Sequence, residues 1–416
     1  MPRITALIEN AGQVLTCAAN APDLVGAQTD VVVALSHDTI ATIGTRAELA
    51  AVHDLSAAER IDAGGGVVMP GFVDCHTHLI FHKSRVEEYA QRVRGLTSAE
   101  IGAMGIPMGI SATAQMMREA TGEQLVESAT ERLDKMLSFG TTTVESKSGY
   151  GLNTATELKT LEVARTLAGS QPIEIVSTFL GAHEFPGDRS RESYITEILE
   201  EMIPEVARRN LAEFNDVYCD QGYYTVAESR TILKRGKEYG LKVKIHTDAY
   251  SHIGGSTLAA ELEAVSADHM NYTDAAEYPL LRDAGVVCVV MPALDFAVHH
   301  VRPFNGRAML DAGITVALAT DMCPGCWLES MPFVIQLACR LYKFSPAEAI
   351  RASTLHAAMA LDRGDRLGSL EAGKQADIAI FPYSRYEDMA YRLGRGQASH
   401  VLKAGKVVLA AGTVMR

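Results

Sequence analysis

The sequence predicts an α/β protein in which a (β/α)8 TIM-like barrel carries a small discontinuous β-sandwich domain made from the two termini. Three observations support this fold class. The 416 residues exceed the roughly 250 to 300 at which a single hydrophobic core stops growing. The middle of the chain alternates apolar runs with helical stretches, and both ends consist of short β-rich pieces with glycine turns.

Composition excludes several classes of protein. With 47% apolar and 21% charged residues, the chain is too hydrophobic to be disordered. Its 38 basic against 51 acidic residues give a net charge of −13, without the basic clusters that nucleic-acid binding needs. We find no run of about 18 apolar residues and no apolar signal core, so we expect no membrane partner and a cytoplasmic location. The seven scattered cysteines do not indicate a disulfide framework.

The two ends of the chain predict the accessory domain. Residues up to about Val68 contain ALIENAGQVLTC and VVVALSHDTIATIG, and the tail contains ADIAIF and SHVLKAGKVVLAAGTV. These are short apolar stretches separated by turn residues, the pattern of small sheets. We therefore expect residues 1–68 and 369–416 to form one β-sandwich domain and residues 69–368 to form the barrel.

Eight apolar runs within the central segment predict the barrel strands. Helical stretches separate them, which is typical of βα units in a parallel sheet, and eight units suffice to close a barrel. The runs are Phe72 to Phe81, Thr141 to Glu145, Ile173 to Gly181, Asn215 to Cys219, Lys242 to His246, Val265 to His269, Val286 to Met291 and Thr315 to Thr320.

Two of the intervening helices have an evident start. Thr154 with Glu157, and Thr225 with Glu228, match the capping-box pattern, in which each side chain satisfies a free backbone amide of the other residue. We expect each threonine to be the N-cap of its helix.

The clearest chemical signal is the placement of polar side chains at strand ends. His76 and His78 follow the first run in PGFVDCHTHLIF, and side chains two residues apart in extended chain point to the same face. His246 ends the fifth run, His269 the sixth, and Asp321 follows the eighth. Barrel active sites lie at the carboxyl ends of the strands, so these five side chains should meet there.

Their chemistry suits a metal. His76, His78, His246 and Asp321 offer three nitrogens and a carboxylate, a donor set for one divalent Zn²⁺ or Fe²⁺ per chain that leaves a position open for water. Such an ion lowers the pKa of bound water towards neutrality. We expect Asp321 to take the proton and pass it to a leaving nitrogen, and His269 to polarise the carbonyl oxygen.

The motifs, taken in order, resemble the amidohydrolase superfamily and more narrowly its imidazolonepropionase family. The resemblance covers nearly the whole chain. It rests on PGFVDCHTHLIF, the Ser84-Arg85 pair, TTVESKSGYGL, FLGAHEFP, KIHTD, SADH, ATDMCPG and GSLEAGKQADIAIF.

The resemblance implies a function and a set of roles. It implies hydrolysis of the ring C–N bond of 4-imidazolone-5-propanoate to N-formimino-L-glutamate in histidine degradation, by a homodimer with one metal per chain. It implies that His269 is catalytic and that Arg85, Tyr150 and His183 contact a substrate bearing a carboxylate. The residues alone leave Arg85 a second reading, an ion pair with Glu87 or Glu88 at the surface.

Three departures from the family pattern fall at expected substrate contacts. The family commonly has Gly-Gly where this chain has His82-Lys83, and Glu or Gln where it has Ala249. It has Asn-Pro-Gly and a small hydroxyl residue where this chain has Cys323-Pro324-Gly325-Cys326. The metal-binding residues therefore carry over better than the specificity.

Other functions stay open at this stage. One is an amidohydrolase acting on a different lactam or a hydantoin-like ring, and another is a heterocycle deaminase. Cys323 and Cys326 also match the spacing of a thiol-disulfide oxidoreductase, although that motif normally opens a helix in a small domain. A barrel that binds a ligand without catalysis is the last alternative.

Overall fold

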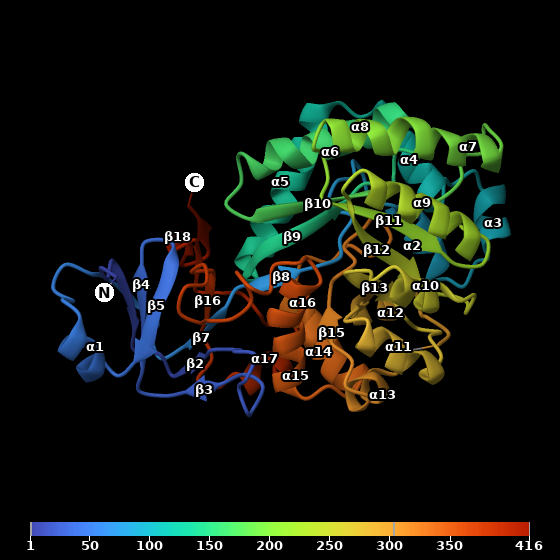
Figure 1. Ribbon diagram of the computed structural model, residues 1–416. Coiled ribbons are helices and arrows are strands. Elements are labelled where there is room, and N and C mark those ends of the chain that lie inside the picture. The colour runs from blue at the N-terminus through green and yellow to red at the C-terminus, as the bar shows by residue number, and fades with distance from the viewer. Residues whose placement is uncertain (1, 303, 416) are drawn as a thin grey trace.

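The barrel is the larger part of the molecule (Figure 1). The computed structural model describes residues 2–302 and 304–415. Eight strands form one sheet in which every pair of neighbours is parallel and the strands follow each other in chain order. They are β8 (Phe72–Asp74), β9 (Thr141–Lys147), β10 (Glu174–Ala182), β11 (Phe214–Cys219), β12 (Lys242–Thr247), β13 (Ser266–His269), β14 (Val287–Val290) and β15 (Val316–Leu318). The predicted fold class is confirmed.

Backbone contacts just beyond β8 and β15 bring the first and last strands together. Thr77 forms a parallel bridge with Met322. His78 N donates to Met322 O at 2.9 Å, and Asp321 N donates to His76 O at 3.1 Å. The seam between the two ends of the sheet therefore runs through the segments that carry three of the predicted metal ligands.

Helices surround the strands because each presents one apolar stripe to the sheet. In α5 (Gly122–Ser138), the stripe of Leu125, Ala129, Leu133, Met136 and Leu137 is fully buried. The helices of the barrel after β9 are α6 (Thr154–Ala168), α7 (Arg191–Glu197), η1 (Ile198–Met202), α8 (Ile203–Arg208), α9 (Val226–Glu238), α10 (Gly255–Glu261), η2 (Ala275–Glu277), α11 (Tyr278–Asp283), α12 (Pro292–Ala297), α13 (Gly306–Asp311), α14 (Met331–Leu341), α15 (Pro346–Ala352) and α16 (Leu355–Met359).

One of the two predicted capping boxes is correct and one is wrong. Thr225 and Glu228 form the reciprocal bonds at the start of α9. Helix α6 is instead capped by Asn153, whose side chain accepts from Thr156 N. Glu157 turns away from the helix end because its carboxylate accepts the backbone N–H groups of Gly149, Gly151 and Leu152. A buried turn with three free donors outcompetes the single donor at the cap.

The termini build two further sheets beside the barrel, on the left of Figure 1. One has the order β5-β4-β1-β6 and the other β19-β18-β17-β16-β7-β2-β3, so strands from both ends of the chain share the second sheet. Apolar side chains of the two sheets form a common core that includes Ile8, Val33, Ile378 and Leu402. The elements are β1 (Ala6–Glu9), β2 (Gln13–Leu15), β3 (Ala27–Gln28), β4 (Val32–Ser36), β5 (Thr39–Gly44), α1 (Arg46–Val52), β6 (Glu59–Asp62), β7 (Val67–Pro70), β16 (Ile378–Phe381), α17 (Glu387–Tyr391), β17 (His400–Lys403), β18 (Lys406–Ala410) and β19 (Thr413–Val414). The domain boundaries at residues 68 and 369 stay a prediction.

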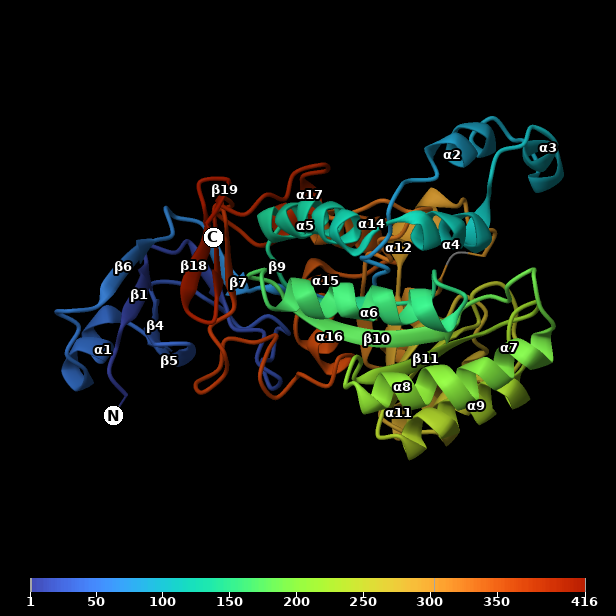
Figure 2. The same ribbon diagram turned by 90° about the horizontal axis from the view of Figure 1, so that it is seen from above.

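The connection between β8 and β9 is long and helical. It contains α2 (Val86–Arg92), α3 (Ser98–Ala103), α4 (Gly109–Glu119) and α5 (Gly122–Ser138). Figure 2 shows α2 and α3 projecting at the end of the molecule opposite the terminal sheets. Among the described residues, no helix is both long enough and apolar enough to cross a membrane.

Candidate metal centre and active site

The predicted metal ligands lie close together at the carboxyl end of the barrel. Nitrogens of His76, His78 and His246 all lie within 4.8 Å of one another. Asp321 Oδ1 lies 3.7 Å from both His76 Nε2 and His78 Nε2. His246 belongs to β12, whereas the other three follow their strands by two to four residues. Chain segments far apart in sequence therefore supply one compact donor set.

The state of these side chains fits a metal. All four are buried, at most 4% exposed. His76 Nε2 and both nitrogens of His246 have no hydrogen-bond partner among the described residues. Burial, and the charge of nearby Lys147, hold the pKa of His76 well below its ordinary value, and burial does the same for His78 and His246. Neutral imidazoles with free lone pairs are the form that binds Zn²⁺ or Fe²⁺.

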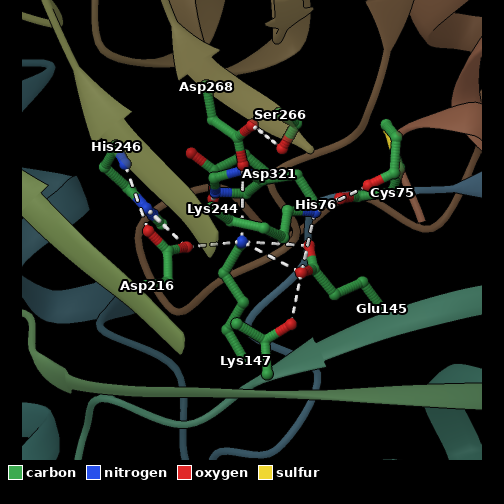
Figure 3. Close-up of polar contacts among 12 residues, drawn as sticks. Cys75, His76, Glu145, Lys147, Asp216, Lys244, His246, Ser266, Asp268 and Asp321 are labelled. Carbon is green, nitrogen blue, oxygen red and sulfur yellow. Dashed lines mark hydrogen bonds and ion pairs between the residues drawn. The ribbon is translucent and has the colours of Figure 1, made fainter. Parts of the chain in front are cut away.

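Buried carboxylates lie behind two of these rings (Figure 3). His76 Nδ1 lies 2.6 Å from Asp268 Oδ2, and His246 Nδ1 lies 3.0 Å from Asp216 Oδ2. Lys147 Nζ lies 2.7 Å from Asp216 Oδ2. The Asp268 contact is a hydrogen bond of the kind that orients an imidazole and fixes its tautomer, whereas the Asp216 contact is a close charge contact without hydrogen-bond geometry.

His269 lies beside the same group. Its ring centroid is 5.3 Å from that of His76 and 5.1 Å from that of His246. Burial lowers its pKa to about 4, so the ring is neutral near pH 7 and one nitrogen carries a proton that it can donate. Both His269 and Asp321 have positive φ, at 85° and 49°, which turns their side chains away from the strand direction. Backbone strain of this kind clusters at functional sites.

A cavity of about 690 Å³ opens above the group. It is large enough for a small-molecule substrate. Three predicted metal ligands, His78, His246 and Asp321, lie on its wall together with His269. The predicted substrate contacts on its wall are Arg85, Tyr150, His183, Cys323 and Gly325.

Arg85 stands at the N-terminus of α2 and reaches over this cavity. Its Nε is buried and has no hydrogen-bond partner among the described residues. Glu88 Oε2 lies 3.6 Å from that Nε, too far for a hydrogen bond, and Glu88 also contacts Arg92 and accepts from Gly109 N. The ion pair that the sequence offered as a second role for Arg85 therefore exists with Glu88, but only as a contact of 3.6 Å without a hydrogen bond. Arg85 retains unfilled donor capacity.

Tyr150 and His183 are held in place from behind. Tyr150 lies in the turn whose neighbouring amides, of Gly149 and Gly151, bind Glu157, so a buried carboxylate holds the backbone on both sides of it. His183 Nδ1 lies 3.1 Å from Gly149 O, which directs its proton to that carbonyl. Its ring stacks on His78 with centroids 4.8 Å apart and planes 3° apart. The two side chains form one wall beside the proposed metal ligands.

The remaining predicted contacts lie further out. Ala249 is buried, does not line the cavity, and its carbonyl accepts from His300 Nε2 at 2.9 Å. Cys326 lines a neighbouring cavity of about 440 Å³. His82 is half-buried and Lys83 is exposed, and neither lines the cavity.

Cys323 and Cys326 do not have the environment of a redox pair. They close a tight turn after β15 through mutual backbone hydrogen bonds of 3.0 and 3.1 Å, and the next helix, α14, begins only at Met331. Burial raises the pKa of Cys323 to about 12 and that of Cys326 well above its ordinary value. Reactive cysteines have lowered pKa values, so the oxidoreductase alternative loses its support.

Sequence reasoning missed the charged groups inside the barrel and part of the cavity wall. Glu145, Lys147 and Asp216 are wholly buried in β9 and β11. Part of the signal was available, because Glu145 and Lys147 are charges two residues apart in one strand and so share a face, but their partner Asp216 lies on another strand. Tyr218, Tyr223 and Tyr250 also line the cavity, and nothing in their spacing indicated this.

Comparison with known proteins agrees with this geometry. Residues 67–408 match the model of the amidohydrolase family. The chain is 45% identical over 363 residues to an imidazolonepropionase of Geobacillus thermodenitrificans, covering 86% of this chain and 85% of the relative. It is 39% identical over 380 residues to one of Haloarcula marismortui, covering 91% of this chain and 90% of the relative.

Solved structures share the fold. An adenosine deaminase from Xanthomonas campestris with bound zinc superposes with a TM-score of 0.73 at 20% identity, over 100% of this chain and 95% of that one. A triazine hydrolase variant gives a TM-score of 0.74 at 19% identity, over 98% and 95%. These likenesses concern architecture alone. The family match and the imidazolonepropionase relatives decide the classification: the chain belongs to the amidohydrolase family, in its imidazolonepropionase group.

Proposed function

We propose that this hydrolase opens the ring of 4-imidazolone-5-propanoate at a C–N bond and releases N-formimino-L-glutamate. The observation that carries the proposal is the convergence of three neutral imidazoles and Asp321 beneath a cavity on whose wall Arg85 has unfilled donors. The relatives named imidazolonepropionase support the choice of ring.

One divalent ion per chain, Zn²⁺ or Fe²⁺, fits the donor set. His76, His78, His246 and Asp321 would hold it, because their free nitrogens and carboxylate face one point and imidazole with carboxylate suits both metals. When bound, the ion supplies the Lewis acidity that makes water a nucleophile near neutral pH.

The protein moves the protons. Asp321 accepts a proton from the attacking water and delivers it to the ring nitrogen as the C–N bond breaks. His269 donates a hydrogen bond to the carbonyl oxygen as negative charge develops there. Both side chains line the cavity, so both can reach a ring bound above the ligand set.

Other residues on the cavity wall position the substrate. Arg85 binds the propionate carboxylate through charge-assisted hydrogen bonds. Tyr150 and His183 line the same cavity with their rings next to His78, and they contact the substrate ring. Fixing one end of the substrate at Arg85 orients the other end for attack, which reduces the entropic part of the barrier.

A turnover screen tests the proposal. Metal-loaded protein is incubated with 4-imidazolone-5-propanoate, hydantoins, other cyclic amides and aminoheterocycles, and products are identified by mass spectrometry. We expect ring opening of the imidazolone with the highest kcat/KM. Turnover of another ring with the imidazolone inert would refute the choice of substrate while leaving the hydrolase chemistry in place.

Cys323 favours one alternative, a related ring with fewer hydrogen-bonding groups. It lines the cavity and contacts the hydroxyl of Tyr150, where the family commonly has an asparagine. Loss of a buried hydrogen-bond partner changes discrimination by orders of magnitude. The variant Cys323→Asn in the same screen separates the two cases, because it would improve turnover of the imidazolone only if Cys323 adapts the site to another ring.

A further inference from the structure

A chain of buried charged groups connects two proposed metal ligands behind their rings. It runs from His246 Nδ1 to Asp216 Oδ2 at 3.0 Å, and from Asp216 Oδ2 to Lys147 Nζ at 2.7 Å. It continues from Lys147 Nζ to Asp268 Oδ2 at 3.4 Å, and from Asp268 Oδ2 to His76 Nδ1 at 2.6 Å. Figure 3 shows the ammonium group of Lys147 in the middle of this chain.

The lysine is needed because the carboxylates are cut off from water. The side chains of Asp216, Asp268 and Lys147 are 0% exposed, as is that of Glu145, which also contacts Lys147 Nζ at 3.0 Å. Buried like charges repel strongly and are stable only when a cation lies between them. Lys147 is the one cation among the described residues whose ammonium lies within 4 Å of both aspartates.

At each end of this series of charged groups, an aspartate lies beside the Nδ1 atom of a histidine, His76 at one end and His246 at the other. A carboxylate beside Nδ1 attracts the ring proton to that nitrogen, which leaves the lone pair on Nε2. At His76 this contact is a hydrogen bond with Asp268, whereas at His246 it is a close electrostatic contact with Asp216 without hydrogen-bond geometry. His76 Nε2 and His246 Nε2 are also atoms without a hydrogen-bond partner in the described part of the chain. The separation of these two atoms therefore depends on the positions of Asp268 and Asp216, and Lys147 is a charged partner that both share.

We propose that Lys147 is a positioning residue that fixes the tautomers and the separation of His76 and His246 through Asp268 and Asp216. The inference rests on the metal site of the proposed function. Lys147 does not line the cavity, so it does not touch a bound substrate directly. Its loss therefore acts through the metal ligands and not through substrate binding.

The test measures binding of Co²⁺ alone, with no substrate. Apoprotein is titrated with Co²⁺ against a chelator, and the visible absorption of the bound ion reports its coordination. We expect Lys147→Met to weaken Co²⁺ binding about 10- to 100-fold, the usual effect of removing a partner behind a ligand, and to shift the absorption bands. In the reloaded enzyme, kcat should fall while KM for the substrate stays within about twofold.

Lys403→Met is the matched control. Lys403 also bridges two carboxylates, Asp377 at 2.6 Å and Glu174 at 3.2 Å, but it lies in β17, away from the cavity. We expect this variant to lose stability and to bind Co²⁺ as the parent does. An equal loss of Co²⁺ affinity in both variants would mean that Lys147 matters only for general stability, and would overturn the inference.

A second variant covers the case in which Lys147→Met does not fold. Lys147→Met combined with Asp216→Asn removes one positive and one negative charge, so the buried cluster keeps its net charge. We expect this double variant to fold and still bind Co²⁺ at least tenfold more weakly than the parent. Parent-like affinity and absorption would refute the role of Lys147. A parent protein that binds no Co²⁺ would instead refute the metal site itself, and the inference with it.

Discussion

The backbone of Gly325 lies directly against the guanidinium group of Arg85. A Cβ atom on Gly325 would lie 2.4 Å from Arg85 Nη2, well inside van der Waals contact. Although the flanking residues Cys323 and Cys326 depart from the family pattern, this glycine matches it. The absence of a side chain at position 325 thus leaves the space that the guanidinium occupies.

Gly325→Ala should displace Arg85 without unfolding the protein. The new methyl group meets the far end of a flexible side chain, so the cost falls on the position of the guanidinium. We expect KM for a carboxylate-bearing substrate to rise about tenfold or more, with the melting temperature within about 2 °C of the parent. Gly122→Ala, at a position where a Cβ meets nothing within 4 Å, is the control and should leave KM unchanged.

Arg85→Ala separates substrate binding from the surface ion pair. A charge-assisted contact contributes about 1.5 to 3 kcal/mol, so KM should rise roughly 10- to 150-fold while the unfolding free energy changes little. Glu88→Gln removes the loose contact at 3.6 Å and should affect KM far less. If Arg85→Ala and the parent have the same KM, Arg85 does not bind the substrate, and its contact with Glu88 is its remaining role.

Asp321→Asn should abolish most turnover and keep the fold. The amide matches the shape of the carboxylate but cannot accept the proton, so kcat should fall at least about 100-fold, as expected for loss of a general base. Circular dichroism and melting temperature check the fold. Elemental analysis of the parent should give one zinc or iron per chain, and fully active metal-free protein would contradict the mechanism.

His356 predicts a loss of stability in mild acid. Burial lowers its pKa to about 4, although its Nδ1 bonds Val316 O. Between pH 6.5, its ordinary pKa, and pH 4, His356 is protonated in the unfolded chain but neutral in the folded chain. The unfolding free energy therefore falls as the pH drops from 6.5 towards 4. The contribution is up to about 3 kcal/mol. Urea unfolding at pH 7 and pH 4.5 should show a smaller difference for His356→Gln than for the parent.

Glu174 makes a second pH-dependent contribution to the unfolding free energy, at a contact between the barrel and the terminal sheets. Glu174 lies in β10 of the barrel, and its partner Lys403 lies in β17. Burial alone would raise its pKa, but Arg366 and Lys403 lower it to about 2. Since the ordinary pKa is 4.5, the contribution is fully present above pH 4.5 and is lost as pH falls through about 2. Glu174→Gln should lower the unfolding free energy at pH 7 by about 2 kcal/mol and leave kcat and KM unchanged. A change in kcat would show that this contact reaches the active site.

The barrel and the convergence of His76, His78, His246 and Asp321 at its carboxyl end were predictable because they depend on local pattern. Apolar runs of strand length mark the eight strands. The period of two residues in extended chain then shows which polar side chains at the strand ends point to the same face. The capping prediction at Thr154 failed because Glu157 is recruited by a turn that exists only in the folded barrel. Lys147 and Asp216 were missed since a buried charge is intelligible only once its partner on another strand is known. The homodimer and the cytoplasmic location stay predictions.

The seam between the first and last barrel strands has a consequence for the order of folding. His76 and Asp321, which touch through backbone at that seam, are separated by 245 positions. Contacts of such long range form late, because the entropy of closing the intervening loop must first be overcome. A nascent chain can complete the ligand set only after its last strand has left the ribosome and docked. Acquisition of the ion by the complete set would then mark the closure of the barrel.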